Sequence, residues 1–133
     1  MAGSKSDYLE LKVLDHILGG GDYTRPATVY LALFTATPSD TGGGTECTGS
    51  NYARLAITNN ATNWPAASAG SKKNGVYFLF PIPTGTWGTV TAIGIFDAAT
   101  SGNLLFWSTI TSKSVTTGVP VYFAVDSITI TEA

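Results

Sequence analysis

The clearest pattern in the chain is a pair of apolar runs at residues 90–96 and 104–110, separated by a short polar segment. The runs carry Ile, Phe, Leu, Val and Trp, whereas the segment between them, DAATSGN, consists of residues that favour turns. Two apolar runs around such a cluster are typical of a β-hairpin. Asp97 is the only ionisable residue between Trp87 and Trp107. The pattern therefore predicts a rigid, apolar hairpin without a reactive cluster.

Further short apolar runs predict strands on both sides of this hairpin. Residues 28–34, TVYLALF, are apolar at successive positions, as expected for a strand that is buried on both faces. The long loop at residues 35–51 is rich in Gly, Thr and Ser, and its length indicates an interface or functional role. The remaining expected strands lie at residues 52–58, 76–81, 113–115, 121–125 and 127–131. About seven or eight short strands with such turns predict a mainly β fold, a jelly-roll-like antiparallel β-sandwich.

One short α-helix is predicted near the N-terminus, at residues 8–18. Asp7 stands at the expected N-cap position, and Glu10 follows three residues later, as in a capping box. Three glycines at 19–21 are expected to end the helix, because glycine readily adopts the left-handed conformation found there.

The predicted helix carries an apolar stripe. Leu11, Leu14 and Leu18 recur at i, i+3 and i+7, with Ile17 beside them. A helix of about eleven residues is marginal by itself in water. We therefore expect the stripe to dock, either on the sheet of its own chain or on a neighbouring subunit.

The glycines also suggest a division of the chain. Residues 1–21 are expected to form the helix and a glycine hinge, and residues 22–133 a single β domain. Deletion of residues 1–20 is then expected to leave a folded β domain that self-associates less. If the leucines instead plug the open end of the sandwich, the same deletion will expose its core.

Composition narrows the function classes. Only 12% of the 133 residues are charged, about half the share usual in soluble globular chains. Seven basic and nine acidic residues give a formal net charge of −2. No basic cluster is larger than Lys72–Lys73, so the electrostatic footprint of nucleic-acid binding is missing. Low charge and abundant Thr favour packing against other proteins.

The sequence also carries no membrane or secretion signal. Its apolar runs are far shorter than the roughly 20 residues that a membrane helix needs. Glu10, Lys12, Asp15 and His16 interrupt the apolar positions near the N-terminus, so the continuous core of a signal peptide is missing. We expect a protein that folds in the cytoplasm and has no membrane partner.

Candidate chemistry is sparse. His16, the only histidine, lies on the predicted helix, and Cys47, the only cysteine, lies in a loop, so no intramolecular disulfide is possible. Nothing in the spacing indicates that the two meet as a catalytic pair. Acidic residues are scattered singly rather than clustered as metal ligands. We expect no catalytic residues, no metal and no cofactor, and therefore no enzyme.

The three tryptophans are the remaining candidates for recognition. Trp87 and Trp107 adjoin or lie within predicted strands, so we expect them to pack in the core or on the sheet. Trp64 lies in a polar loop between Asn63 and Pro65, where burial and exposure are both open. An exposed tryptophan would suit a subunit contact or a glycan. The candidate residues for self-association or for contact with another protein are Leu11, Leu14, Leu18 and Trp64.

Four segments, in order, resemble a family of small virion proteins of tailed bacteriophages: PATVYLALFTATPSDTGGGTE, YARLAIT, NGVYFLFP and WGTVTAIGIFDAATSGNLLFW. Members are labelled phage tail fibre protein or phage structural protein, and related small proteins are trimeric capsid cement (decoration) proteins on the outer head. The resemblance covers nearly the whole chain and includes the helix segment LELKVLDHILGG. It implies a virion protein with no catalytic motif. Cys47 departs mildly from the β-branched residue expected at its position.

Physical arguments favour the head over the tail. A chain of 133 residues without repeats or coiled coil has no shaft with which to project from the particle. A cement protein that binds several capsid subunits stabilises the assembled shell by mass action. We expect a homo-oligomer, a trimer, that binds the major capsid protein and is made in the host bacterial cytoplasm. The alternatives are a tail or tail-fibre component and, further, a carbohydrate-binding module.

Overall fold

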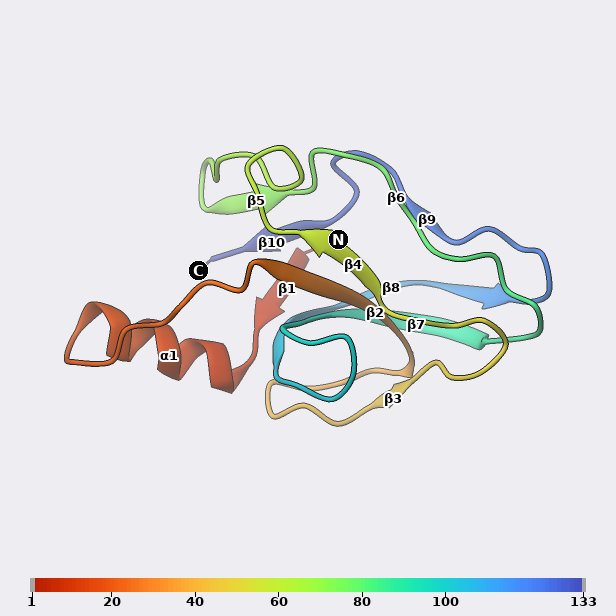
Figure 1. The fold of residues 1–133 in the computed structure, drawn as a ribbon, viewed down its shortest axis with the longest axis horizontal. Helices are drawn as coiled ribbons and strands as arrows, with labels where there is room; N and C mark the ends of the chain where they lie inside the picture. The colour runs from red at the N-terminus through yellow and green to blue at the C-terminus, as the bar shows by residue number, and fades with distance from the viewer. Residues whose placement is uncertain (1, 133) are drawn as a thin grey trace.

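The structure, a computed structural model, describes residues 2–132 as strands around an apolar core with a short helix near the N-terminus (Figure 1). This confirms the prediction of a mainly β fold with antiparallel sheets and one short N-terminal helix. In the described residues the elements are β1 (Ala2–Lys5), α1 (Asp7–Ile17), β2 (Thr28–Ala36), β3 (Thr45–Glu46), β4 (Leu55–Thr58), β5 (Ser71–Lys73), β6 (Phe78–Leu79), β7 (Gly88–Phe96), β8 (Leu104–Val115), β9 (Tyr122–Phe123) and β10 (Thr129–Thr131).

The centre of the fold is the antiparallel set β2, β7 and β8. The predicted hairpin is confirmed as β7 and β8, with Ile93 opposite Ser108 and Ile95 opposite Phe106. Asp97 closes its loop, because its Oδ1 accepts a hydrogen bond from the Asn103 amide at 2.7 Å. The segment DAATSGN, residues 97–103, therefore forms the turn between β7 and β8.

Both faces of β2 are covered, as its unbroken apolar run predicts. Leu31 and Leu33 are fully buried in the main core on one face. On the other face Ala32 and Phe34 pack in a second cluster with Ala92. One edge of β2 pairs with β7, and its other edge pairs with β4 and then β3.

The sheet continues beyond β8 through β1, β10 and β5, and β6 and β9 form a separate two-stranded sheet. In Figure 1, β5, β10, β6 and β9 lie along the upper side of the central strands, and α1 lies at the lower left. The arrangement is sandwich-like. One pair departs from the antiparallel pattern, since β1 and β10 run parallel.

Three strands were missed by the sequence pattern: β1, β3 and β5. β1 reads AGSK and β5 reads SKK, so neither has the apolar alternation by which a strand is recognised. Their backbones are placed by long-range pairing, in which Lys5 lies opposite Phe106 and Ile130 opposite Lys72. β1 thus joins residues 2–5 to the sheet.

The N-cap of α1 is Ser6, so the prediction of Asp7 at that position is wrong. The Ser6 backbone is extended and its Oγ accepts a hydrogen bond from the Leu9 amide at 3.2 Å. The same hydroxyl donates to the carbonyl of Leu104, and the Ser6 amide donates to the carbonyl of Leu105 at 2.8 Å. Pairing of β1 with β8 holds Ser6 in place, so Asp7 becomes the first helical residue, where its carboxylate still favours the positive helix end.

Two tryptophans take the positions expected of them. Trp87 is buried, and its Nε1 donates to the Ser50 carbonyl at 2.9 Å, which satisfies its polar atom in the core. Trp107 is half-buried on β8 and donates to Oδ1 of Asp40 at 2.8 Å. Both rings therefore act as packing residues of the sheet.

Candidate functional site

Helix α1 has two apolar faces, and only one of them packs on its own chain. Leu9 is 6% exposed in the main core, with Tyr8 and Val13 half-buried beside it. The other face carries four exposed residues, which we call the leucine stripe: Leu11 (63% exposed), Leu14 (57%), Ile17 (69%) and Leu18 (76%). The predicted stripe is therefore present, and it faces solvent in the single chain.

The exposure of the stripe is unfavourable for an isolated chain. Burying one leucine or isoleucine side chain contributes about 1.5–3 kcal/mol relative to leaving it in water. The Ser6 cap and the buried Leu9 hold the helix on the rest of the chain, whereas the side chains of the stripe are exposed. Four large apolar side chains on and just after a helix of 11 residues therefore lie in solvent.

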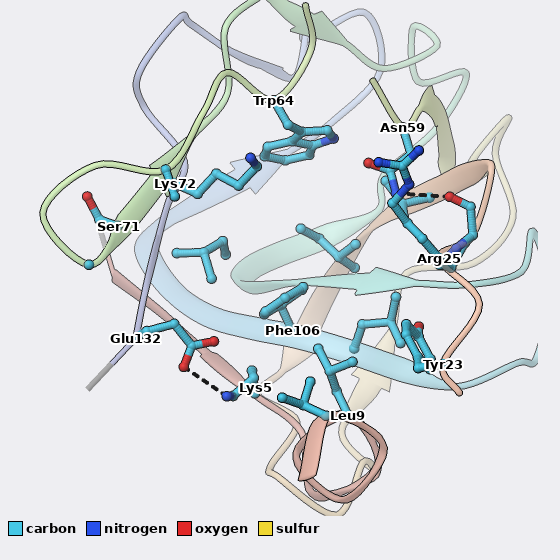
Figure 2. A pocket seen from close by; sticks show the side chains of 18 residues that line it. Lys5, Leu9, Tyr23, Arg25, Asn59, Trp64, Ser71, Lys72, Phe106 and Glu132 are labelled. Atoms are coloured by element: carbon cyan, nitrogen blue, oxygen red, sulfur yellow. Dashed lines mark hydrogen bonds and ion pairs between the residues drawn. The ribbon is translucent and has the colours of Figure 1, made fainter. Parts of the chain in front are cut away.

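Beside the helix lies an apolar cavity of about 410 Å³, which opens to solvent (Figure 2). Its floor is the inner face of the central strands, including Val29, Ile95 and Phe106. Leu9 and Val13 of α1 form one wall. The cavity thus exposes part of the main core and has the size of a binding pocket.

The mouth of the cavity carries basic side chains. Lys5 is paired with Glu132 at 2.8 Å across one side. Figure 2 shows Lys72 beside Trp64 at one end and Arg25 beside Asn59 at the other. Within residues 2–132, neither Arg25 nor Lys72 has an acidic partner within 4.0 Å. The apolar cavity therefore has a rim with unpaired positive charge.

Trp64 forms part of this cavity, and exposure of its ring on a polar loop is ruled out. Only 8% of the residue is exposed, and its ring lies 5.5 Å from that of Phe78. The loop turns inward because Oδ1 of Asn60 accepts hydrogen bonds from the amides of Thr62 and Asn63. The polar neighbours that suggested an exposed loop thus form a tight turn that buries the indole.

His16 and Cys47 have separate surroundings. His16 Nδ1 accepts a hydrogen bond from the Tyr23 amide at 3.2 Å, and lies 3.9 Å from the Asp22 carboxylate. Cys47 is 3% exposed, and burial raises the pKa of its thiol to about 11, so it is protonated at neutral pH. Across the described part of the chain, no group of three or more His, Cys, Asp or Glu is arranged to hold a metal ion.

A buried polar network around Arg54 escaped the sequence analysis. Its guanidinium binds Glu46 through Nε at 2.9 Å and through a second nitrogen at 2.8 Å. It also donates to the carbonyls of Ala98 and Ser101 at 2.8 Å, and lies 3.7 Å from the centre of the Phe96 ring. The network fastens the β7–β8 loop to β3 and β4, which is a structural role. No spacing in the sequence indicates it, since its members come from three separate segments.

A second exposed apolar surface lies on and near the β6–β9 sheet. The rings of Tyr77 and Tyr122 stack with centroids 5.1 Å apart, and each residue is about half-exposed. The other large apolar residues exposed there are Leu79, Ile82 and Val125. We call this set the tyrosine ledge.

The model of the family described as podophage GP4 fiber I protein gp80 matches residues 4–131. The chain belongs to this family. The match covers α1 and both sheets, and it confirms the resemblance to small virion proteins of tailed phages. Membership makes the chain a phage structural protein of a fibre family and a virion component. A search of curated proteins finds no match.

One further finding concerns membranes. In the described chain, α1 spans 11 residues, and no helix has the length and apolar character needed to cross a bilayer.

Proposed function

We propose that the chain is a non-enzymatic structural component of a podophage fibre, which acts by binding neighbouring virion proteins through exposed apolar surfaces. The observation that carries this proposal is the leucine stripe, an apolar face that none of the described residues, 2–132, covers. The fibre family supplies the setting. Low charge supports the same role, because the cores of protein interfaces are depleted in charged residues.

Assembly through several weak contacts suits a domain of this size. Each copy presents the leucine stripe, which suits contact between copies, and the tyrosine ledge, which suits contact with another virion protein. Copies held in a symmetric homo-oligomer, which we propose to be a trimer, engage a partner at several points, so modest contacts add up. Binding to the assembled particle then favours the assembled state.

A capsid cement protein that binds the major capsid protein is the second candidate. A single small β domain without a shaft favours this role, because it suits a protein that bridges subunits already in place. The family description favours the fibre. The carbohydrate-binding alternative is weakened, because Trp64, the tryptophan considered for contact with a glycan, is buried.

Localisation on the particle tests the proposal. Virions labelled with an antibody against the chain, or imaged by cryo-electron microscopy, are expected to show it on fibres. Regular density over the faces of the head would instead establish the cement role. Absence of the chain from purified virions would overturn both.

A further inference from the structure

We propose that the leucine stripe of one copy packs into the apolar cavity of a second copy, so that copies join head to tail. This inference rests on the proposed function, because it specifies one of the contacts through which the structural protein assembles. It commits to a single occupant of the cavity, the helix of another copy of this chain.

The occupant must come from a second molecule. Leu9 and Val13 of α1 line the cavity with the inner face of the helix. The leucines of the stripe, Leu11, Leu14 and Leu18, lie on the opposite, exposed face. Since a helix presents opposite faces in opposite directions, the stripe cannot reach the cavity of its own chain. Within the part of the chain that the structure describes, the leucines of the stripe and the cavity therefore both lack a partner.

The two surfaces match in chemistry and size. Both are lined by aliphatic residues, with Ile95, Leu105 and Ile130 inside the cavity. A volume of about 410 Å³ corresponds to the space of roughly a dozen water molecules, which is enough for more than one leucine side chain. Packing the stripe there would remove apolar surface from water on both copies at once.

Their charges also match. On α1, Glu10 and Asp15 flank the stripe, since each lies four positions from one of its leucines. The mouth of the cavity carries Arg25 and Lys72, which have no acidic partner within 4.0 Å among residues 2–132. Docking would bring acidic side chains beside basic ones and fix the orientation of the helix.

Such a contact is heterologous, because it joins two different surfaces. A heterologous contact gives a closed ring if the rotation between copies closes, and an open filament if it does not. A three-membered ring would account for the proposed trimer, in which every stripe and every cavity is occupied.

Mixing two variants tests the contact directly. Leu14→Ser with Leu18→Ser removes two leucines of the stripe and keeps the cavity, whereas Ala67→Trp fills the mouth of the cavity and keeps the stripe. In sedimentation velocity at a concentration at which the natural chain is oligomeric, each variant alone is expected to be monomeric. An equimolar mixture is expected to form heterodimers and nothing larger, since one intact stripe and one intact cavity remain.

The matched control is Leu79→Ser with Val125→Ser, which removes two exposed apolar side chains outside the stripe and is expected to keep the natural oligomer. A mixture that stays monomeric, or an Ala67→Trp variant that associates like the natural chain, would overturn the proposal in favour of stripe packing against stripe. A natural chain that is monomeric at 100 micromolar, a concentration of roughly the order at which weak specific contacts form, would also overturn it.

Charge reversal provides a second test, which does not depend on Ala67→Trp folding. Glu10→Lys with Asp15→Lys, and separately Arg25→Glu with Lys72→Glu, are each expected to weaken association about tenfold. Mixing the two variants is expected to restore it, because acidic and basic surfaces face each other again. Equal association of all these samples would contradict the contact.

Labelling of virions tests the proposed function separately from this contact. A chain that self-associates but is absent from fibres would support the contact and overturn the proposed function. A chain that is monomeric but present on fibres would support the proposed function and overturn the contact.

Discussion

At the residue scale, the strongest side-chain interactions lie away from the surfaces proposed for assembly. The Arg54 network is largely buried, with the Arg54 side chain 8% and the Glu46 side chain 25% exposed. Tyr52 belongs to it, since its hydroxyl donates to Oε2 of Glu46 at 2.7 Å and accepts from the Leu33 amide at 3.0 Å. These contacts hold the β7–β8 loop against β3 and β4.

Arg54→Ala is expected to lower the free energy of unfolding by about 3–5 kcal/mol, because it leaves the Glu46 carboxylate without its partner in a mostly buried site. Denaturant unfolding followed by circular dichroism measures the loss. Lys113→Ala is the control, since Lys113 lies 5.8 Å from the Tyr122 ring in an exposed position and its removal is expected to cost little. Equal small losses for both variants would show that the network does not stabilise the fold.

Because of Cys47, the free energy of unfolding is expected to change with pH in the alkaline range. Burial raises the pKa of its thiol to about 11 from an ordinary value of 9.0. Above pH 9 the unfolded chain loses the thiol proton while the folded chain keeps it, so stability falls as pH rises through 9 to 11. Burial also raises the pKa of the Tyr52 hydroxyl, which acts in the same direction.

Between pH 9 and pH 11, we expect the free energy of unfolding of Cys47→Ala to fall by less than that of the natural chain, with a difference of up to about 3 kcal/mol. Unfolding in denaturant at a series of pH values measures it, and the natural chain is the reference. The variant has a lower stability at neutral pH if the cavity it leaves is not filled, but only the slope with pH bears on the prediction. An unchanged slope would contradict it.

At the element scale, β1 and α1 are coupled through Ser6. One hydroxyl caps the helix and also donates to the Leu104 carbonyl on β8. Ser6→Ala is expected to destabilise the protein by about 1–3 kcal/mol, because it removes the cap and leaves a buried carbonyl unsatisfied. Asp7→Ala is the control. Asp7 is exposed in the first turn, so its substitution is expected to lower the free energy of unfolding by less. If Asp7→Ala destabilised the protein more than Ser6→Ala, Asp7 and not Ser6 would be the residue that caps the helix.

A second coupling between elements runs through Asn74, which is fully buried. Its Nδ2 donates to the carbonyls of Val76 and Ala124, and its Oδ1 accepts from the Ile128 amide at 2.9 Å. The side chain thus ties the segment before β6 to the segment before β10. The amide group supplies donors and an acceptor at once, as this position requires.

At the scale of the whole molecule, the position of β1 within the sheet bears on the predicted division of the chain at residue 21. Deletion of residues 1–20 removes β1 and the buried Leu9 together with the leucine stripe. Leu11→Ser with Leu14→Ser removes only exposed side chains. We expect the deletion to lower the thermal midpoint strongly, and the double substitution to leave it nearly unchanged while it weakens self-association. Thermal melting and sedimentation measured on the same samples separate the two effects, and a deletion variant that melts like the natural chain would show the β domain to be independent.

The sequence by itself determined the β7–β8 hairpin, the two-sided burial of β2 and the short helix, because each depends on local periodicity and turn residues. It also determined the leucine stripe, since spacing along a helix fixes which residues share a face. Tertiary structure decided the rest. Pairing placed β1, β3 and β5 and moved the helix cap from Asp7 to Ser6. Tertiary packing also buried Trp64 against Phe78 and brought Arg54 to Glu46 and the β7–β8 loop. These features join residues far apart in the chain, so local patterns carry no signal for them.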